Sequence, residues 1–369
     1  MNDLTRTNPP TIEPSPDPSG GHTPAFRLAT TLVGGLARWE VLLGLILLTF
    51  IWVGASLSPF FLTPRNFSNL TAAVMEVAIM ALPMTLVIIV GEIDLSVESM
   101  VGLSSSVLGF LWAAGFPLWV GIVCVLILGA LGGLLNGLLV ARAGLPSLVV
   151  TLGTLALFRG LALIVLGPRG ISDFPPAFTA FGFGNVPGTP IPWPLVVFAS
   201  LALLLGLTLH RTWIGRQIVA IGKSQSVARY SGVRVTRLKT SLFVLSGTIA
   251  ALAGVILTSR FASARADAGQ GMTLIVVTIV LLGGVNIFGG AGTIPGVVLA
   301  VFTLAVLENA LRLINVSAEI QSIAIGLLLI ISVVIPTTAH QVKSAIDRVR
   351  TGRPPPGRSV DPGEMAGEP

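Results

Sequence analysis

The sequence predicts an all-α polytopic integral membrane protein with about ten transmembrane helices and both termini in the cytoplasm. Three observations lead to this fold class. Hydrophobic residues make up 53% of the 369 residues and charged residues only 10%, against about 25% in soluble domains. The apolar residues gather in long segments, and the mean hydropathy is +0.90. Lys and Arg are distributed unequally over the loops between those segments.

Ten apolar segments lie between two polar ends. A helix needs about 20 residues to cross about 30 Å of hydrocarbon, and the segments are close to that length. Short turns separate the second segment from the third and the eighth from the ninth, so eight or nine spans, or re-entrant helices, remain alternatives. The segments are residues 41–61, 72–90, 96–114, 118–140, 147–167, 193–210, 239–258, 273–289, 293–311 and 320–336.

Both ends of the chain are rich in Pro, Gly and small polar residues, which bury too little apolar surface to offset the loss of chain entropy. We expect residues 1–38 to be a disordered cytoplasmic tail and residues 339–369 to be a basic, Pro-rich cytoplasmic tail. The first apolar run begins near Val41 and has no cleavage site of small residues after it, so the N-terminus is not expected to be a secretory signal.

The positions of the basic residues predict the orientation. With the N-terminus inside, the inner loops and tails hold 16 of the 22 Lys and Arg, the outer loops hold five, and Arg159 lies within a segment. This asymmetry follows the positive-inside rule. The net charge of +6 therefore reflects orientation in a lipid membrane, and no nucleic-acid partner is expected.

Enzyme chemistry has little support in the sequence. The single cysteine, Cys124, excludes an intramolecular disulfide, and the three histidines lack the spacing of metal ligands. Gly222-Lys223-Ser224 looks like the end of a phosphate-binding loop, but Gln217 stands where its first glycine belongs. We expect no catalytic, cofactor or metal residue in this chain; another polypeptide would bind any ATP and Mg²⁺ that the protein uses.

Two stripes of small residues predict close helix packing, which we expect inside one subunit, with a subunit interface as the alternative. They are Gly129, Gly133 and Gly137, and Gly292, Gly296 and Ala300.

The loop from His210 to Lys239 carries seven Lys and Arg and no acidic residue. Residues 224–230 predict a short helix with an apolar edge at Val227 and Tyr230, and Gly232 is a suitable stop. We expect this helix to dock a cytoplasmic partner; a solvated basic loop beside anionic lipid is the alternative.

Five motifs in order point to a family. They are Gly91–Ser96 (GEIDLS), Asn136-Gly137 followed by Thr151–Gly160 (TLGTLALFRG), the cytoplasmic stretch Gly215–Val233, Leu245–Gly254 and Gly283–Thr293. Together they resemble the permease subunits of bacterial ABC importers for monosaccharides, the ribose/xylose/rhamnose group that includes autoinducer-2 permeases. The resemblance covers about residues 60–337.

The resemblance implies a permease domain over residues 39–338, with a cytoplasmic coupling loop at 211–238, in the bacterial inner membrane. It implies a pathway for a monosaccharide or related small polyol, delivered by a periplasmic binding protein and driven by a separate ABC ATPase. A second permease subunit, identical or paralogous, would complete the pore. The alternative is an ion-coupled secondary transporter that uses Glu76 and Glu308 as coupling sites.

Three groups of candidate residues follow from the motifs. For ATPase coupling they are Gly215, Arg216, Val227, Ala228, Tyr230 and Gly232. For the translocation pathway or gate they are Gly91, Glu92, Asp94, Ser96, Asn136, Thr151 and Arg159. For helix turns and packing they are Gly129, Gly133, Gly283, Gly284, Gly289, Gly290 and Gly292.

The chain also departs from the family pattern. Glu92 and Glu98 stand where the family usually has glycine, and the coupling helix lacks the usual acidic residue. Residues 273–275 (TLI) replace the family's acidic-plus-apolar run.

Some polar residues carry two interpretations each. Arg159 is costly in mid-membrane unless it has a partner or lines water; we expect an ion pair with Glu76 or Glu308, with pore lining as the alternative. Asp94 is expected to cap the following helix or to belong to an inner gate. Asn136 and Thr151 suit hydrogen bonds to sugar hydroxyls or between helices.

Overall fold

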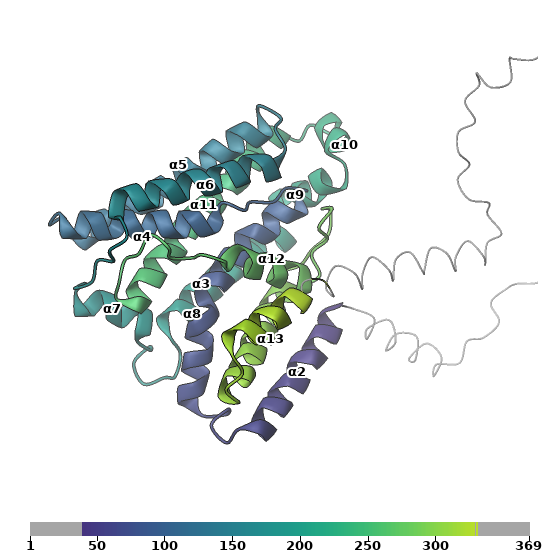
Figure 1. Cartoon of the computed structure of the whole chain (residues 1–369). Coiled ribbons are helices and arrows are strands. Elements are labelled where there is room, and N and C mark those ends of the chain that lie inside the picture. Colours follow the sequence, from purple (N-terminus) through teal and green to yellow (C-terminus); the bar gives the residue numbers. More distant parts are fainter. Residues whose placement is uncertain (1–38, 329, 331–369) are drawn as a thin grey trace, which may run out of the picture.

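The computed structural model describes residues 39–328 and residue 330, and within that range it contains helices and no strand. The two predicted tails lie outside the described residues. Figure 1 shows the helices α2 Trp39–Leu57, α3 Pro64–Ile89, α4 Val97–Ala113, α5 Leu118–Ala141, α6 Ser147–Leu166, α7 Pro176–Phe183, α8 Trp193–Arg211, α9 Trp213–Lys223, α10 Gln225–Tyr230, α11 Val235–Phe261, α12 Met272–Leu282 and α13 Ile294–Leu313.

The all-α membrane fold is confirmed. Seven of these helices are long and apolar enough to cross a membrane, namely α2, α3, α5, α6, α8, α11 and α13. The third, eighth and tenth predicted segments contain shorter apolar helices, α4, α12 and a helix at Ala318–Leu328. The number of crossings therefore stays a prediction. α12 stops at Leu282, earlier than the predicted segment, because the chain turns at Gly283 and Gly284.

Helix α3 forms the centre of the bundle. Its start is favoured by Pro64 in the first turn and by Thr63, whose Oγ1 accepts a hydrogen bond from the Asn66 amide at 3.3 Å. In its most apolar stretch 89% of the residues are buried, against 11% in α2. In Figure 1, α3 runs between a flank that contains α5, α6 and α11 and the opposite flank of α2 and α13. The exposed apolar faces of the outer helices are the surface expected to meet lipid.

The stripe of Gly129, Gly133 and Gly137 packs α5 against α11 of the same chain. A β-carbon on Gly133 would collide with the carbonyl oxygen of Phe243, and one on Gly129 would collide with that of Gly247. Because glycine has no side chain, the two backbones can approach closely here. Close packing of this kind stabilises helix pairs in lipid, where the hydrophobic effect does not drive helices together.

Helix ends gather into two groups, as alternating crossings require. At one end the Trp39 indole donates to the carbonyl oxygen of Leu282 at 2.7 Å, and the Ile294 amide donates to Nε2 of His210 at 3.3 Å. At the other end Asn66 at the start of α3 bonds to Asn309 near the end of α13 at 2.9 Å. α9 and α10 lie at the first end and α7 at the second (Figure 1). By the positive-inside rule, the basic loop that contains α9 and α10 predicts that the first end faces the cytoplasm, and we call it the cytoplasmic end.

Candidate functional site

The cytoplasmic loop folds into two helices, α9 and α10, of which the sequence analysis expected only the second. α9 is amphipathic: Gly215, Ile218 and Ile221 are buried at helical spacing, and Thr212 caps its start by accepting from the Gly215 amide at 3.4 Å. The apolar spacing in Trp213–Lys223 was the available signal. This helix attaches the loop to the bundle and so positions α10.

α10 ends in a complete Schellman motif. The Val233 amide donates to the Ala228 carbonyl at 3.0 Å and the Gly232 amide to the Arg229 carbonyl at 3.1 Å. Gly232 has φ +84°, a backbone conformation that glycine adopts without strain. The sequence placed this helix and its stop correctly.

Val227, Ala228 and Tyr230 were predicted together as coupling residues, but they lie on different faces of α10. Val227 is 62% exposed and Tyr230 93% exposed, so both are available to a partner, whereas Ala228 is buried against its own chain. Ala228, which was predicted to be a coupling residue, therefore packs within its own subunit. Its side chain joins the apolar core of the bundle.

Gly222 brings two of the sequence motifs to the end of α3. A β-carbon at Gly222 would collide with the carbonyl oxygen of Ile89 and the amide nitrogen of Gly290. The Gly290 amide donates to the Ile89 carbonyl at 2.8 Å. The last turn of α3, the end of α9 and the turn at Gly289-Gly290 thus meet, and only glycine fits at the contact. The resemblance of residues 222–224 to a phosphate loop is explained by this packing.

Asp94 lies in a buried polar cluster built from three elements. Its Oδ1 accepts hydrogen bonds from the Ser96 amide at 3.1 Å and the Ser96 hydroxyl at 2.6 Å, and its Oδ2 accepts from the Ser246 hydroxyl of α11 at 2.8 Å. Asn136 of α5 donates to the Ser96 hydroxyl at 2.8 Å. All four side chains are buried. The cluster fixes the loop between α3 and α4 to α5 and α11.

Asp94 does not cap α4 directly. Ser96 occupies the position before α4, and its hydroxyl, which donates to Asp94 and accepts from Asn136, makes no capping bond to that helix. Thr151 is also engaged inside the bundle: its hydroxyl donates to the Ser147 carbonyl at 2.8 Å and lies 3.3 Å from the Ile93 carbonyl. Asn136 and Thr151 therefore serve contacts between the α3–α4 loop and its neighbours.

Glu92 belongs to a second contact of the same loop. Lys239 Nζ, near the start of α11, lies 2.5 Å from Glu92 Oε1 and 3.0 Å from Oε1 of Gln225, the first residue of α10. The side chains of Lys239 and Glu92 are only 6% and 14% exposed. Lys239, Gln225 and Ser246 were missed as site residues, because their partners are far away in the sequence.

Arg159 has partners other than those expected. Its Nη1 donates to the Ala266 carbonyl at 2.7 Å and lies 3.4 Å from that of Ala268, while Nη2 lies 3.9 Å from Glu98 Oε1. Neither Glu76 nor Glu308 is available: Glu76 pairs with Arg260 and Glu308 with Arg312, one turn away on α13. The sequence missed this because Ala266 and Ala268 act through backbone oxygens, which no side-chain pattern reveals.

Two departures from the family pattern meet beside Arg159. Glu98 Oε2 accepts a hydrogen bond from the Thr273 amide at 3.2 Å, in the first turn of α12. A carboxylate at this place satisfies one of the amides that a helix start leaves without a partner, and it suits the positive end of the helix dipole. The acidic group absent at position 273 is thus supplied from α4.

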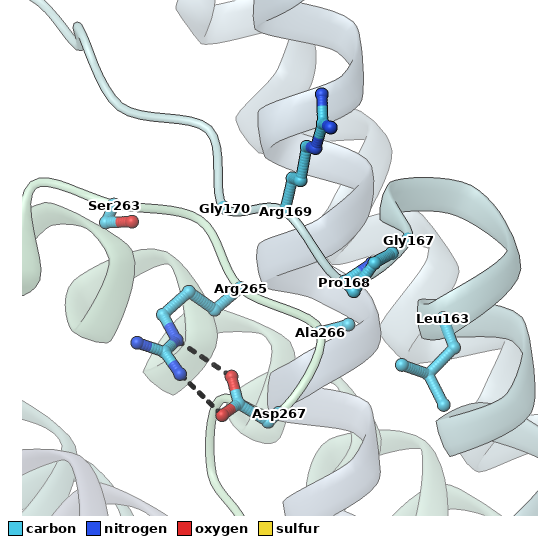
Figure 2. Close-up of a pocket in the computed structure, with 9 residues that line it drawn as sticks. All are labelled: Leu163, Gly167, Pro168, Arg169, Gly170, Ser263, Arg265, Ala266 and Asp267. Atoms are coloured by element: carbon cyan, nitrogen blue, oxygen red, sulfur yellow. Dashed lines mark hydrogen bonds and ion pairs between the residues drawn. The ribbon is translucent and has the colours of Figure 1, made fainter.

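The outer end carries a cavity of about 440 Å³ between the end of α6 and the segment that follows α11. Arg265 and Asp267 line this cavity, and Arg265 donates two hydrogen bonds to the Asp267 carboxylate, at 2.8 and 2.7 Å. Figure 2 shows this pair, with the Arg169 side chain directed away from it. The hydrogen bonds from Arg265 hold the pKa of the Asp267 carboxyl below its usual range. Both side chains are more than half exposed, so this wall presents charge to the outside. Sequence reasoning did not find this cavity.

No three His, Cys, Asp or Glu side chains gather as a metal site within residues 39–328. The arrangement is suited to transmitting movement. It consists of the cytoplasmic helix α10 with its exposed Tyr230, the glycine contact at Gly222, and the polar α3–α4 loop anchored to α5 and α11.

Comparisons with known proteins connect the chain to transport permeases. Residues 66–333 match the family described as branched-chain amino acid transport system / permease component. The chain is 37% identical over 330 residues to the autoinducer 2 import system permease protein LsrD of Photorhabdus laumondii, covering 87% of this chain and 98% of that one. It is 43% identical over 264 residues to the protein of the same name from Yersinia enterocolitica, covering 70% and 79%.

No solved structure gives a significant match. The family model spans most of the chain, and the two relatives align along 98% and 79% of their own lengths, so the resemblance inferred from five motifs is confirmed. The protein is an ABC-type permease of the inner membrane, and the chain belongs to the branched-chain amino acid transport system / permease component family.

Proposed function

We propose that this chain forms the membrane pathway of an ABC importer for a monosaccharide or a related small polyol, and that autoinducer 2 is its first candidate substrate. A periplasmic binding protein would deliver the substrate, a separate ATPase would bind ATP and Mg²⁺, and a second permease subunit would complete the pore. The names of the LsrD relatives support the substrate class.

The observation that carries the proposal is the presentation of α10. Val227 and Tyr230 are exposed at the cytoplasmic end, while Ala228 is buried and Gly232 ends the helix. Rigid presentation of an aromatic and an aliphatic side chain on one short helix suits insertion into an apolar groove of an ATPase subunit. The loop behind it is basic, which orients it toward the cytoplasm.

Binding-protein docking is proposed at the opposite end, where the exposed Arg265 and Asp267 wall the outer cavity. Exposed charges attract a complementary surface over about 10 Å at 0.1 M salt. We expect docking there to weaken as salt is raised.

The competing proposal is an ion-coupled secondary transporter that uses Glu76 or Glu308. Glu76 lies 2.7 Å from Arg260 and Glu308 lies 3.8 Å from Arg312, so both carboxylates already have cationic partners. A coupling carboxylate must exchange its cation during transport. The ion pairs therefore favour the ABC importer.

Reconstitution separates the two proposals. The permease, its partner ATPase and the binding protein are placed in proteoliposomes, and uptake of autoinducer 2 and of ribose is measured with and without internal or external ATP. We expect uptake only with ATP on the ATPase side and with binding protein present. Uptake that persists without ATP and collapses with an ionophore would establish the secondary transporter instead.

A further inference from the structure

Lys239 joins three parts of the subunit at its cytoplasmic end. Its ammonium contacts Glu92 in the α3–α4 loop at 2.5 Å and Gln225 in α10 at 3.0 Å, and Lys239 itself lies near the start of α11. Of these three side chains, only that of Gln225 is exposed.

We propose that the Glu92–Lys239–Gln225 bridge is the contact through which movement of α10 reaches the α3–α4 loop, so that Lys239 and Glu92 are coupling residues. The proposal rests on the function proposed above, in which an ATPase moves α10. It assigns a task to a glutamate that replaces the family's usual glycine.

The anchoring of the α3–α4 loop supports this assignment. α11 holds the loop at two places: Lys239 binds Glu92, and Ser246 binds Asp94 at 2.8 Å. These two residues of α11 are seven apart, which is about two turns and places them on one face. Only the contact at Lys239 also reaches α10. The cytoplasmic half of the loop is therefore tied to the coupling helix, while the inner half is tied to the bundle.

The chemistry of the contact also favours a transmitting role. A buried ion pair contributes little net stability compared with apolar side chains of the same size, because both charges lose hydration. An ammonium has three donors, so Lys239 holds Glu92 and Gln225 at once. Methionine fills similar space but can hold neither partner. The hydrogen bonds of Lys239 therefore connect α10 to the α3–α4 loop in a way that apolar contacts at the same position could not.

The test uses the full complex of permease, ATPase and binding protein in proteoliposomes, with autoinducer 2 as the probe. Two quantities are measured: the number of autoinducer 2 molecules taken up per ATP hydrolysed, and the melting temperature of the complex. We expect Lys239→Met to lower this ratio by about tenfold, within the range typical of coupling between sites. Because the variant leaves Glu92 without its cation, its melting temperature should also fall, but by too little to account for the loss. Arg237→Met is the matched control, since Arg237 is an exposed cation on the same turn of α11.

Two further variants keep the proposal falsifiable. Exchange of the charges, Glu92→Lys with Lys239→Glu, is expected to recover at least part of the lost ratio. Gln225→Ala removes an exposed side chain and leaves the ion pair, so it should fold normally and still lower the ratio.

A normal ratio in Gln225→Ala and Lys239→Met would overturn the proposal. A fall in melting temperature that accounts for all lost uptake, with no recovery in the exchanged pair, would overturn it in favour of a purely structural role. Failure of the parent complex to use ATP for uptake would instead refute the proposed function, so the two failures are distinguishable.

Discussion

Arg260 and Glu76 are 184 positions apart in the sequence, yet Arg260 Nε donates to Glu76 Oε1 at 2.7 Å. The pair ties the outer end of α11 to the central helix α3. The Glu76 side chain is 1% exposed and that of Arg260 is 18% exposed. The guanidinium also lies 4.5 Å from the ring centre of Phe261. A buried carboxylate here is tolerated because this arginine neutralises it.

Removing the arginine should destabilise the subunit. Arg260→Met leaves Glu76 buried without its cation, and breaking a buried pair in this way costs about 3–5 kcal/mol. We expect a lower melting temperature in detergent, and recovery of much of it when Glu76→Gln is added. A double variant no more stable than Arg260→Met would contradict the pairing.

Arg159→Ala should loosen the segment that leads into α12. Its hydrogen bonds to the Ala266 and Ala268 carbonyls are lost, and a hydrogen bond from a charged group is worth about 1.5–3 kcal/mol. Arg159→Lys should be intermediate, since an ammonium keeps the charge without the planar fork. Thermal melting beside an uptake assay checks this. Unchanged melting with failed uptake would assign Arg159 to the pathway.

The contact between Glu98 and Thr273 predicts that the carboxylate can be moved from α4 to α12. Glu98→Gly should lower both stability and uptake, because the start of α12 loses its acceptor and Arg159 loses its nearest carboxylate. Adding Thr273→Glu should restore part of the loss, since residue 273 lies next to the site that the Glu98 carboxylate occupies. A double variant that is worse than Glu98→Gly would show that the position of the carboxylate matters in its own right.

Gly133→Ala should separate α5 from α11. The added methyl group would meet the Phe243 carbonyl, and overpacking of this kind costs about 1–3 kcal/mol. Gly44→Ala in α2 is the control, since no atom lies within 4 Å of its added β-carbon. We expect a fall in melting temperature only for Gly133→Ala. Equal melting of both variants would mean that the two helices pack less closely than described.

Two substitutions in α10 should act differently. Tyr230→Asp places a carboxylate on the exposed edge, so it should weaken ATPase binding and leave the melting of the isolated permease unchanged. Ala228→Asp buries a carboxylate within the subunit and should lower that melting temperature. Pull-down of the ATPase and melting of the permease measure the two effects. Normal ATPase binding by Tyr230→Asp would remove α10 from the docking surface.

Local patterns were enough to predict the membrane fold, the apolar helical segments and the short helix before Gly232, but not α7 or α9. Each depends on neighbouring residues: a run of apolar side chains crosses lipid, and a glycine with positive φ ends a helix. The family could also be predicted, because five short motifs kept their order along the chain.

Partners of the polar residues were decided by the tertiary structure. Arg159 was expected to meet Glu76 or Glu308, but it lies beside Glu98 and two backbone carbonyls. Charge and hydropathy indicate that a buried ion needs a partner, since an uncompensated charge in the membrane is costly. Which partner it finds depends on how α4, α6 and the segment after α11 cross in space. Backbone carbonyls are the same in every residue, so no sequence pattern distinguishes the two that Arg159 binds.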